Sequence, residues 1–217
     1  THFYLFTGGE PLVRKNDIVK LAEAHHDCES HIFTNGTLID EQFCKDLQRL
    51  GNISLALSLE GFEEVNDGRR GQGVYDKVMH AFELMKAHGL LFGTSICYTR
   101  ANISTITDQK FLDMIVDKGC RYAWYFHYMP VGNDADASLL PTMEQREFMY
   151  HKVREIRHDD MLFTMDFQND GEFVGGCIAG GRNYCHINSN GDVEPCVFIH
   201  YSGANINEKS LIECLQQ

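Results

Sequence analysis

The sequence contains no apolar run that approaches the roughly 18 residues needed to cross a membrane. Its first residues carry no basic segment followed by an apolar one, so nothing in them is typical of a signal peptide. No cluster of Lys and Arg is longer than a pair such as Arg69-Arg70, and the net charge is −12. Nucleic-acid-binding proteins usually carry a basic surface. These absences therefore predict no nucleic-acid partner, no membrane partner and a cytoplasmic location.

A GxGxxG motif is also missing after every strand-like run, which disfavours a Rossmann-type nucleotide-binding domain. What the 217 residues do contain is a globular composition, with 43% apolar and 23% charged residues. This length is ordinary for one α/β domain with a single core. Because the chain begins at Thr1 rather than Met, inside a strand-like run, we expect it to be a fragment of a longer protein.

Short apolar runs alternate with longer amphipathic ones. The strand-like runs cover 2–7, 30–35, 53–59, 91–99 and 122–130, and the helical runs cover 16–26, 39–50, 73–89, 107–119 and 142–158. Thr142 with Gln145 three residues later is typical of a capping box. Five βα units in a row predict a parallel α/β sheet, either open or part of a barrel, over residues 1–164.

Polar and glycine residues gather where these strands end. They form the segments Thr7 to Glu10, Thr34 to Thr37, Ser58 to Gly61 and Met129 to Gly132. In parallel α/β folds the ligand lies at the carboxyl edge of the sheet, so we expect a binding site along this rim.

After about residue 160 the helical period disappears. Residues 163–168 are typical of a strand, and a small cysteine-rich module is predicted over 165–217. Four cysteines earlier in the chain stand singly in apolar surroundings and are predicted to be packed in the core: Cys28, Cys44, Cys97 and Cys120. Three more lie within twenty residues of one another and indicate a site: Cys177, Cys185 and Cys196.

A hairpin connects two of these three cysteines. Asn190-Gly191 is a strong signal for a two-residue turn, and that turn pairs Cys185 with Cys196. Directly opposed residues project on one face with Cβ atoms about 4.5–5.5 Å apart. With Cys177 eight residues earlier, three thiolates can reach one metal centre.

The residues alone leave other uses of these thiols open. Cys185 and Cys196 can form a cross-strand disulfide. A zinc site is a second alternative, with the cysteines joined by His186 or His200. For a cluster, the fourth ligand is missing from this chain, or is Cys214, or is an exchangeable group.

The motifs FTGGEP at 6–11, FTNGT at 33–37 and SLEG at 58–61, with NDGRRG at 66–71, resemble the radical S-adenosylmethionine (SAM) superfamily. The match extends over essentially the whole chain and is closest to the subgroup with a C-terminal SPASM or twitch extension. It implies a partial (β/α)6 TIM-like barrel, entered at its second strand. The spacing of Cys177, Gly191 and Cys196 is similar to the start of the SPASM and twitch pattern, which implies an auxiliary iron–sulfur cluster.

The resemblance also implies which side chains contact SAM. The GGEP segment would bind the amino group, and the fourth barrel strand with the following arginine would bind the ribose and carboxylate. The residues implied are Gly8, Gly9, Glu10, Asn35, Ser58, Glu60, Arg70, Met129 and Val131.

One departure from the family is serious. The CxxxCxxC motif that holds the SAM [4Fe–4S] cluster does not occur in this chain. In the family it precedes GGEP, so we expect it upstream of residue 1, and we do not expect the chain as given to cleave SAM.

For the parent protein, the resemblance implies a radical enzyme that forms a 5′-deoxyadenosyl radical and abstracts a hydrogen atom. The expected substrate is a peptide or protein, or else a small molecule, and the expected electron donor is a reduced flavodoxin- or ferredoxin-like protein. The alternative is a non-catalytic scaffold that binds zinc or another metal.

Overall fold

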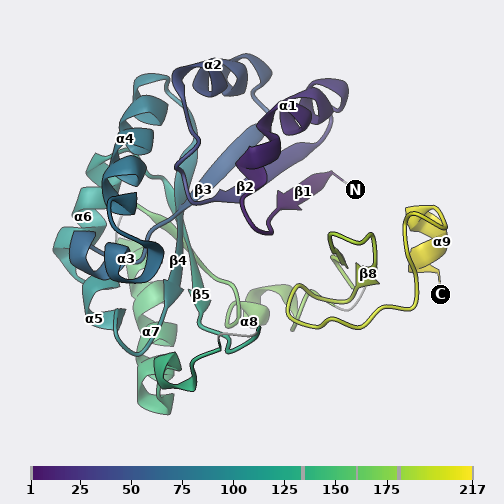
Figure 1. Cartoon of the computed structure of the whole chain (residues 1–217). Coiled ribbons are helices and arrows are strands. Elements are labelled where there is room, and N and C mark those ends of the chain that lie inside the picture. The colour runs from purple at the N-terminus through teal and green to yellow at the C-terminus, as the bar shows by residue number, and fades with distance from the viewer. Residues whose placement is uncertain (1, 133–134, 160, 180–181, 217) are drawn as a thin grey trace. The chain divides into compact units, whose positions relative to one another are not determined.

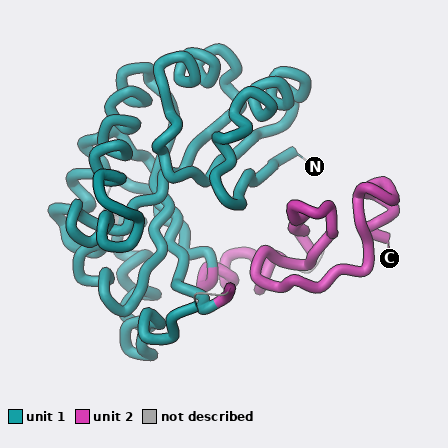
Figure 2. The backbone as a smooth tube through the Cα atoms, in the orientation of Figure 1, with its two compact units in different colours: residues 1–130, 135–167 teal, residues 131–134, 168–217 magenta. Residues whose placement is uncertain are grey.

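The computed structural model describes residues 2–132, 135–159, 161–179 and 182–216. The chain divides into two compact units, one of residues 1–130 with 135–167 and one of 131–134 with 168–217 (Figure 2). The division into domains predicted from the sequence, at 164/165, stays a prediction.

The larger unit contains one six-stranded parallel sheet whose strands follow chain order (Figure 1). The strands are β1 (Phe3–Phe6), β2 (Glu29–Thr34), β3 (Ile53–Ser58), β4 (Phe92–Tyr98), β5 (Tyr122–His127) and β6 (Phe163–Asp166). The predicted α/β class and partial barrel are confirmed. The strand predicted at 163–168 is β6, which pairs in parallel with β5 and so extends the main sheet.

Helices connect the strands and cover the outer face of the sheet (Figure 1). They are η1 (Pro11–Arg14), α1 (Lys15–Ala24), α2 (Glu41–Leu50), α3 (Glu63–Arg70), α4 (Val74–Ala87), α5 (Ile103–Ile106), α6 (Gln109–Asp117), η2 (Ala137–Leu139) and α7 (Met143–Asp159). The main core lies between these helices and the sheet. Within the described part of the chain, no helix is both long and apolar enough to cross a membrane.

Local signals in the sequence explain where several helices begin. The Asp40 carboxylate accepts a hydrogen bond from Phe43 N at 2.8 Å and caps α2. The predicted capping box before α7 is present: Thr142 N donates to Gln145 Oε1 and Gln145 N donates to Thr142 Oγ1. Each bond satisfies a backbone or side-chain group that the first helical turn leaves without a partner.

The sheet is strongly curled. The rings of Phe33 on β2 and Trp124 on β5 have centroids 5.7 Å apart, although β3 and β4 separate these strands in the sheet. The Tyr122 hydroxyl on β5 likewise crosses β4 and donates to the Leu55 carbonyl on β3 at 2.7 Å. Gly93 on β4 lies beneath Tyr122 and has no side chain to obstruct it. The inner face is therefore concave, as in a section of a barrel.

The smaller unit has little regular structure. It contains α8 (Gly171–Val174), a hairpin of β7 (His186–Ile187) and β8 (Val193–Glu194), and α9 (Leu211–Leu215). A loop packs beside the hairpin, because Val193 N donates to the Ala204 carbonyl and Ile206 N to the Gly191 carbonyl. Ser210 and Glu213 form a capping box at the start of α9.

Gly93→Ala is expected to destabilise the protein by about 3 kcal/mol, at the upper end of ordinary overpacking. A Cβ at this position would lie 2.1 Å from the Tyr122 carbonyl oxygen, so β5 must move. Urea unfolding measures the change. Gly68→Ala in α3 is the matched control, since its Cβ would meet nothing within 4 Å; it is expected to stabilise by about 0.5–1 kcal/mol. Equal free energies of unfolding for the Gly93 variant and the wild type would contradict the close approach of Tyr122 to Gly93.

Candidate functional site

The segment after β1 brings Glu10 to the end of β2. The Glu10 carboxylate accepts hydrogen bonds from Leu12 N at 3.0 Å, Thr34 Oγ1 at 2.6 Å and Asn35 N at 2.8 Å. It therefore caps η1 and joins the ends of two neighbouring strands. A carboxylate has about four acceptor sites, so Glu10 retains capacity for one more donor such as an ammonium group.

The two glycines before Glu10 leave the backbone open. Gly8 has φ +116, which other residues rarely adopt, and a Cβ on Gly8 or Gly9 would meet nothing within 4 Å. A ligand can thus approach the main chain closely at this strand end.

Behind the rim lies a buried carboxylate that holds two arginines. Glu60 is fully buried after β3, and its Oε2 accepts from Arg69 Nη1 at 2.6 Å. Its Oε1 accepts from Arg70 through Nε at 2.9 Å and through Nη2. The two arginine side chains keep 34% and 25% exposure, so each presents part of its guanidinium to solvent. A buried carboxylate needs such partners because leaving it unpaired is costly.

The loop around Glu60 is fixed from both sides. Its backbone N donates to Asn66 Oδ1 at 3.1 Å, and its carbonyl accepts from Asn102 Nδ2 at 3.0 Å. Asp67 caps the segment that leads into α4, accepting from Tyr75 N at 2.8 Å. Neither arginine pairs with Asp67 or Glu64 in the described contacts, because both are paired with Glu60.

A hollow of about 340 Å³ opens above these arginines. It is lined by Asn35, Thr37, Arg69, Arg70 and Val74. Asn35 is held in place because its Oδ1 accepts from both Thr37 N and Thr37 Oγ1. The volume falls within the range of small-molecule sites, and the exposed donors suit an anionic group.

The hollow brings together only some of the residues predicted from the sequence. Asn35 and Arg70 line it, while Glu10 and Glu60 stand behind it and hold its lining. Ser58 lies half-buried at the end of β3, opposite Ser95. Met129 Sδ lies 2.9 Å from His127 Nε2, and Val131 belongs to the other compact unit. Ser58 and Met129 are not among the residues lining this hollow.

Three lining residues were not predicted from the sequence: Thr37, Arg69 and Val74. Arg69 directly precedes Arg70. The sequence signal that could have identified Arg69 is Glu60, nine positions earlier. On a helix such neighbours point in different directions, so a sequence pattern favours only one of them. In the structure Glu60 draws both toward the same hollow.

The sequence profile of the Radical SAM superfamily matches residues 1–117, which include this rim and the helices behind it. The chain belongs to the radical SAM superfamily.

Relatives and solved structures agree with this membership. Mycofactocin maturase MftC of Mycolicibacterium smegmatis is 30% identical over 210 residues, covering 88% of this chain and 51% of that protein. PqqA peptide cyclase of Granulibacter bethesdensis is 27% identical over 204 residues, covering 88% and 53%. The structure of Streptococcus suis SuiB bound to S-adenosylmethionine has a TM-score of 0.74 at 20% identity, covering 97% and 53%. The latter likeness shows the fold, and this radical SAM chain spans about half the length of the curated relatives it matches.

The donors in the hollow fit one part of the family's cofactor. Two guanidinium groups and the side-chain NH2 of Asn35 suit the carboxylate end of SAM. Glu60 is fully buried and both of its oxygens accept from arginines, so it holds the arginines that line the hollow. This sequence contains no CxxxCxxC motif to ligate the SAM [4Fe–4S] cluster.

In the smaller unit the hairpin register differs from the prediction. His186 pairs with Glu194 and Ile187 with Val193, so Cys185 stands opposite Pro195 rather than Cys196. Gly191 N donates to the Asn188 carbonyl and Gly191 has φ +89, which makes a three-residue loop with a bulge. The Asn188 side chain favours this loop because its Oδ1 accepts from Asn190 N and Asp192 N.

The three cysteines expected to bind metal are free thiols. Cys177 is exposed, and Cys185 and Cys196 are half-buried; Cys196 Sγ accepts from the Tyr184 hydroxyl at 3.0 Å. Burial and this hydrogen bond raise the pKa of Tyr184. The sulfur atoms of Cys177, Cys185 and Cys196 do not all lie within 4.8 Å of one another, so these three cysteines do not form a ready site for a single zinc ion. Ligands on different irons of a cluster need not approach so closely. Residues 180 and 181, within the link from Cys177 to Cys185, lie outside the described part of the chain.

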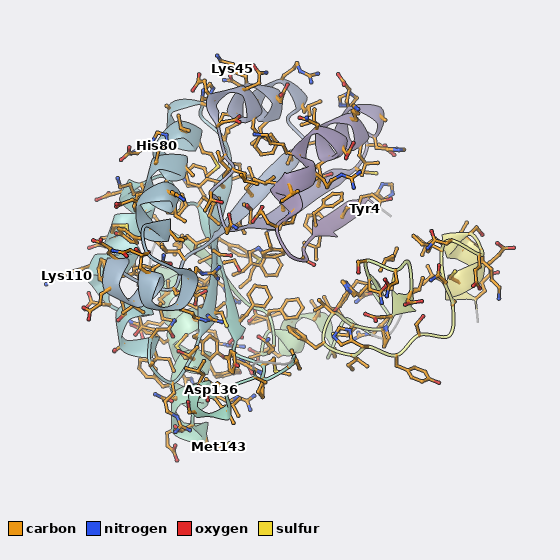
Figure 3. The ribbon with its side chains drawn as sticks, viewed as in Figure 1. Tyr4, Lys45, His80, Lys110, Asp136 and Met143 are labelled. Atoms are coloured by element: carbon orange, nitrogen blue, oxygen red, sulfur yellow. The ribbon has the colours of Figure 1, made fainter. Side chains whose placement is uncertain are left out.

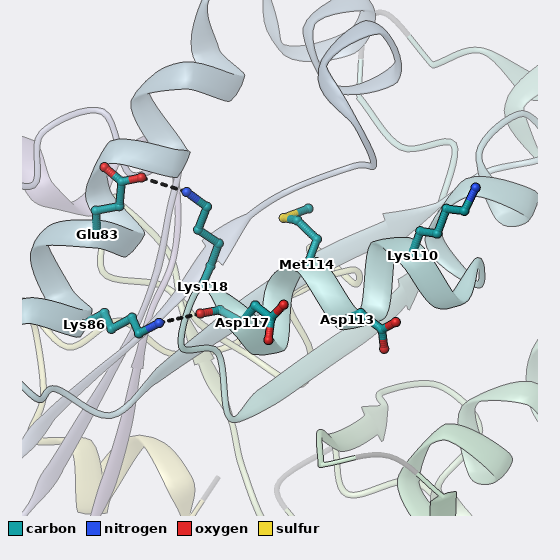
Figure 4. Close-up of a pocket in the computed structure, with 7 residues that line it drawn as sticks. All are labelled: Glu83, Lys86, Lys110, Asp113, Met114, Asp117 and Lys118. Carbon is teal, nitrogen blue, oxygen red and sulfur yellow. Dashed lines mark hydrogen bonds and ion pairs between the residues drawn. The ribbon is translucent and has the colours of Figure 1, made fainter.

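A larger hollow of about 670 Å³ lies on the outer helices rather than at the rim (Figure 4). Its walls carry charged side chains of α4 and α6, with an ion pair between Glu83 and Lys118 and a hydrogen bond from Lys86 Nζ to the Asp117 carbonyl. No residue predicted for the site lines it. Surface pairs of this kind are typical of a solvated helical face.

Deeper in the concave face, an aromatic layer surrounds His31. The imidazole is 4% exposed and lies against Phe33, Tyr122 and Trp124. Ser54 Oγ donates its single proton to Glu29 Oε1. His31 Nδ1 lies 2.9 Å from Ser54 Oγ, so His31 Nδ1 must be the donor of that hydrogen bond. Burial lowers the pKa of His31 to about 4.

The free energy of unfolding is therefore expected to decrease as the pH is lowered, because the buried His31 binds a proton less readily than it does in the unfolded chain. The unfolded chain protonates this residue near pH 6.5 and the folded chain only near 4, so stability declines by up to about 3 kcal/mol as pH drops between these values. Urea midpoints at several pH values measure the slope. His31→Phe should flatten it, whereas His80→Gln, on the outer surface of α4 (Figure 3), should not. An unchanged slope in His31→Phe would refute this assignment.

Proposed function

We propose that the whole protein is a radical SAM enzyme that modifies a peptide or protein. The observation that carries this proposal is the hollow at the carboxyl ends of parallel strands, where two arginines are aimed by a buried glutamate. In this family, bound SAM supplies by reductive cleavage the 5′-deoxyadenosyl radical that abstracts a hydrogen atom from substrate. The competing proposal is a metal-binding scaffold without catalysis.

Each rim residue has a proposed role. The remaining acceptor site of Glu10 and the open backbone of Gly8 and Gly9 would hold the amino group of SAM. Arg70, with Arg69 beside it, would hold the carboxylate.

The remaining predicted residues have weaker support. Asn35 would contribute its backbone and side chain at the edge of the hollow. Glu60 would orient both arginines, and its contact with the ribose stays proposed on the resemblance. Ser58, Met129 and Val131 remain proposed as SAM neighbours on the resemblance alone.

For the smaller unit we propose an auxiliary iron–sulfur cluster on Cys177, Cys185 and Cys196. Thiolates are the ligands such clusters require. The hairpin register places Cys185 opposite Pro195, one position from Cys196, so the proposal rests on the grouping of the three thiols rather than on a shared hairpin face.

The substrate proposal rests on the names of relatives. PqqA peptide cyclase and SuiB bound to precursor peptide SuiA both concern peptides, which favours a peptide substrate here. Fe-coproporphyrin III synthase of Methanosarcina barkeri, 26% identical over 181 residues, favours a flat tetrapyrrole as the second candidate. The half-buried rings of Phe33, Trp124 and Phe126 on the concave face suit either an aromatic side chain or such a ring.

We also propose a cellular compartment and an electron donor for the protein. All eight cysteines lie among the described residues and are free thiols, which fits a reducing, cytoplasmic compartment. A reduced flavodoxin- or ferredoxin-like protein is the proposed electron donor, because reductive cleavage of SAM needs one electron.

The first test is release of 5′-deoxyadenosine by the whole protein, purified without oxygen with its clusters loaded and given SAM and dithionite. We expect product, and we expect Arg70→Gln to raise the SAM concentration needed about 10- to 100-fold, since a charge-assisted bidentate bond is lost. Lys45→Gln, on the exposed surface of α2 (Figure 3), is the matched control and should behave as wild type.

Absence of product from fully loaded protein would favour the scaffold instead. Supplying candidate precursor peptides or coproporphyrin in the same assay separates the substrate classes. A peptide whose mass decreases by that of one or more hydrogen atoms supports the peptide substrate. A change in the mass of the porphyrin alone supports the tetrapyrrole substrate instead.

The second test is iron and acid-labile sulfide content of this chain after anoxic reconstitution. Cluster binding predicts about four of each per chain, as for a [4Fe–4S] centre. Replacing Cys177, Cys185 and Cys196 by Ser should remove both, while Cys44→Ala with Cys120→Ala, two buried core cysteines, should not. Iron and sulfide that persist in the triple serine variant would contradict the assignment of these ligands.

A further inference from the structure

Three ligand-bearing side chains meet at the opposite edge of the sheet, where β1 and β2 begin. His2 precedes β1, and Asp27 and Cys28 precede β2. One donor atom from each residue, a ring nitrogen, a carboxylate oxygen and the Sγ atom, lies within 4.8 Å of the other two. No other group of three such residues is this close in the part of the chain that the structure describes. These residues take no part in the rim site or in the cysteine-rich module.

The backbone around this cluster is held firmly. Glu29 N donates to the His2 carbonyl at 2.8 Å, which aligns the starts of the two strands. The Asn52 side-chain amide donates to the carbonyls of His25 and Cys28 at 3.1 Å each, and so fixes the loop that ends α1. The loop is thus ordered by hydrogen bonds to its backbone carbonyls and amides.

Their chemistry is that of a zinc site. Imidazole, thiolate and carboxylate are the three ligand types that zinc takes in proteins, at about 2.0–2.1, 2.3 and 2.0–2.2 Å respectively. Tetrahedral geometry at those bond lengths places donor atoms about 3.4–3.8 Å apart. Cys28 is 9% exposed and fixed, whereas His2 and Asp27 are exposed. The two exposed side chains are the ones that would rotate to bring the three donor atoms to these separations.

We propose that His2, Asp27 and Cys28 bind one zinc(II) ion, with water in the fourth position. In its absence the Cys28 thiol forms a side-chain hydrogen bond with Asp27, and binding replaces that bond and releases the thiol proton. The ion would cross-link the start of β1 to the loop before β2.

The experiment uses cobalt(II) as the probe, because a thiolate ligand gives an intense charge-transfer band with this ion. The experiment is performed on the full chain with Cys177, Cys185 and Cys196 replaced by Ser, so that thiolates of the C-terminal module cannot contribute to the cobalt band. We expect this protein to bind one cobalt with a thiolate band, to lose the band when zinc is added, and to show a higher unfolding temperature with zinc. Cys28→Ser should abolish the band.

Further variants separate binding from folding. His2→Ala and Asp27→Asn alter exposed side chains and should each weaken cobalt binding by more than the 10- to 100-fold expected from a group that only orients a ligand. Cys44→Ser, at a buried thiol of α2, is the matched control and should keep the band. Circular dichroism checks that each variant is folded. No thiolate band in the triple-serine protein, or a band that survives Cys28→Ser, would overturn the proposal.

Discussion

The curvature of the sheet depends on one close approach between strands. Tyr122 crosses β4 above Gly93 and bonds to the Leu55 carbonyl of β3, which requires that β4 carry no side chain at that point. Rings of β2 and β5 then meet over the two intervening strands. Because the sheet curls, the carboxyl ends of its strands converge on one rim. Asn35, after β2, and Arg70, after β3, can therefore share a single hollow.

The second constraint is electrostatic and belongs to Glu60. A carboxylate removed from water must be neutralised, and here two guanidiniums do so from the solvent side. The same contacts keep two like charges next to each other at the wall of the hollow, where they would otherwise repel. Glu60 thus orients both cations at the wall of the hollow.

Much of this arrangement could be predicted from local signals. The alternation of strand and helix, the cap at Asp40 and the box at Thr142 depend on residues close in sequence, and the structure contains them. The hairpin turn was also located correctly, but its length was wrong by one residue. Asn188 accepts two backbone hydrogen bonds across the loop, and that side chain outweighs the preference of Asn190-Gly191 for a two-residue turn. A shift of one residue moves a side chain to the other face.

The sequence by itself determined the family, the α/β class and the strand ends that carry the rim, because these follow from short motifs and from periodicity. It also determined which cysteines stand alone and which are grouped. Only the tertiary structure decided that Arg69 joins Arg70 at the hollow, that Glu60 is enclosed behind them, and that Cys185 faces Pro195. Those outcomes depend on contacts between separate elements and on burial. Spacing along a chain does not specify either, since both arise only when the sheet curls and its helices pack.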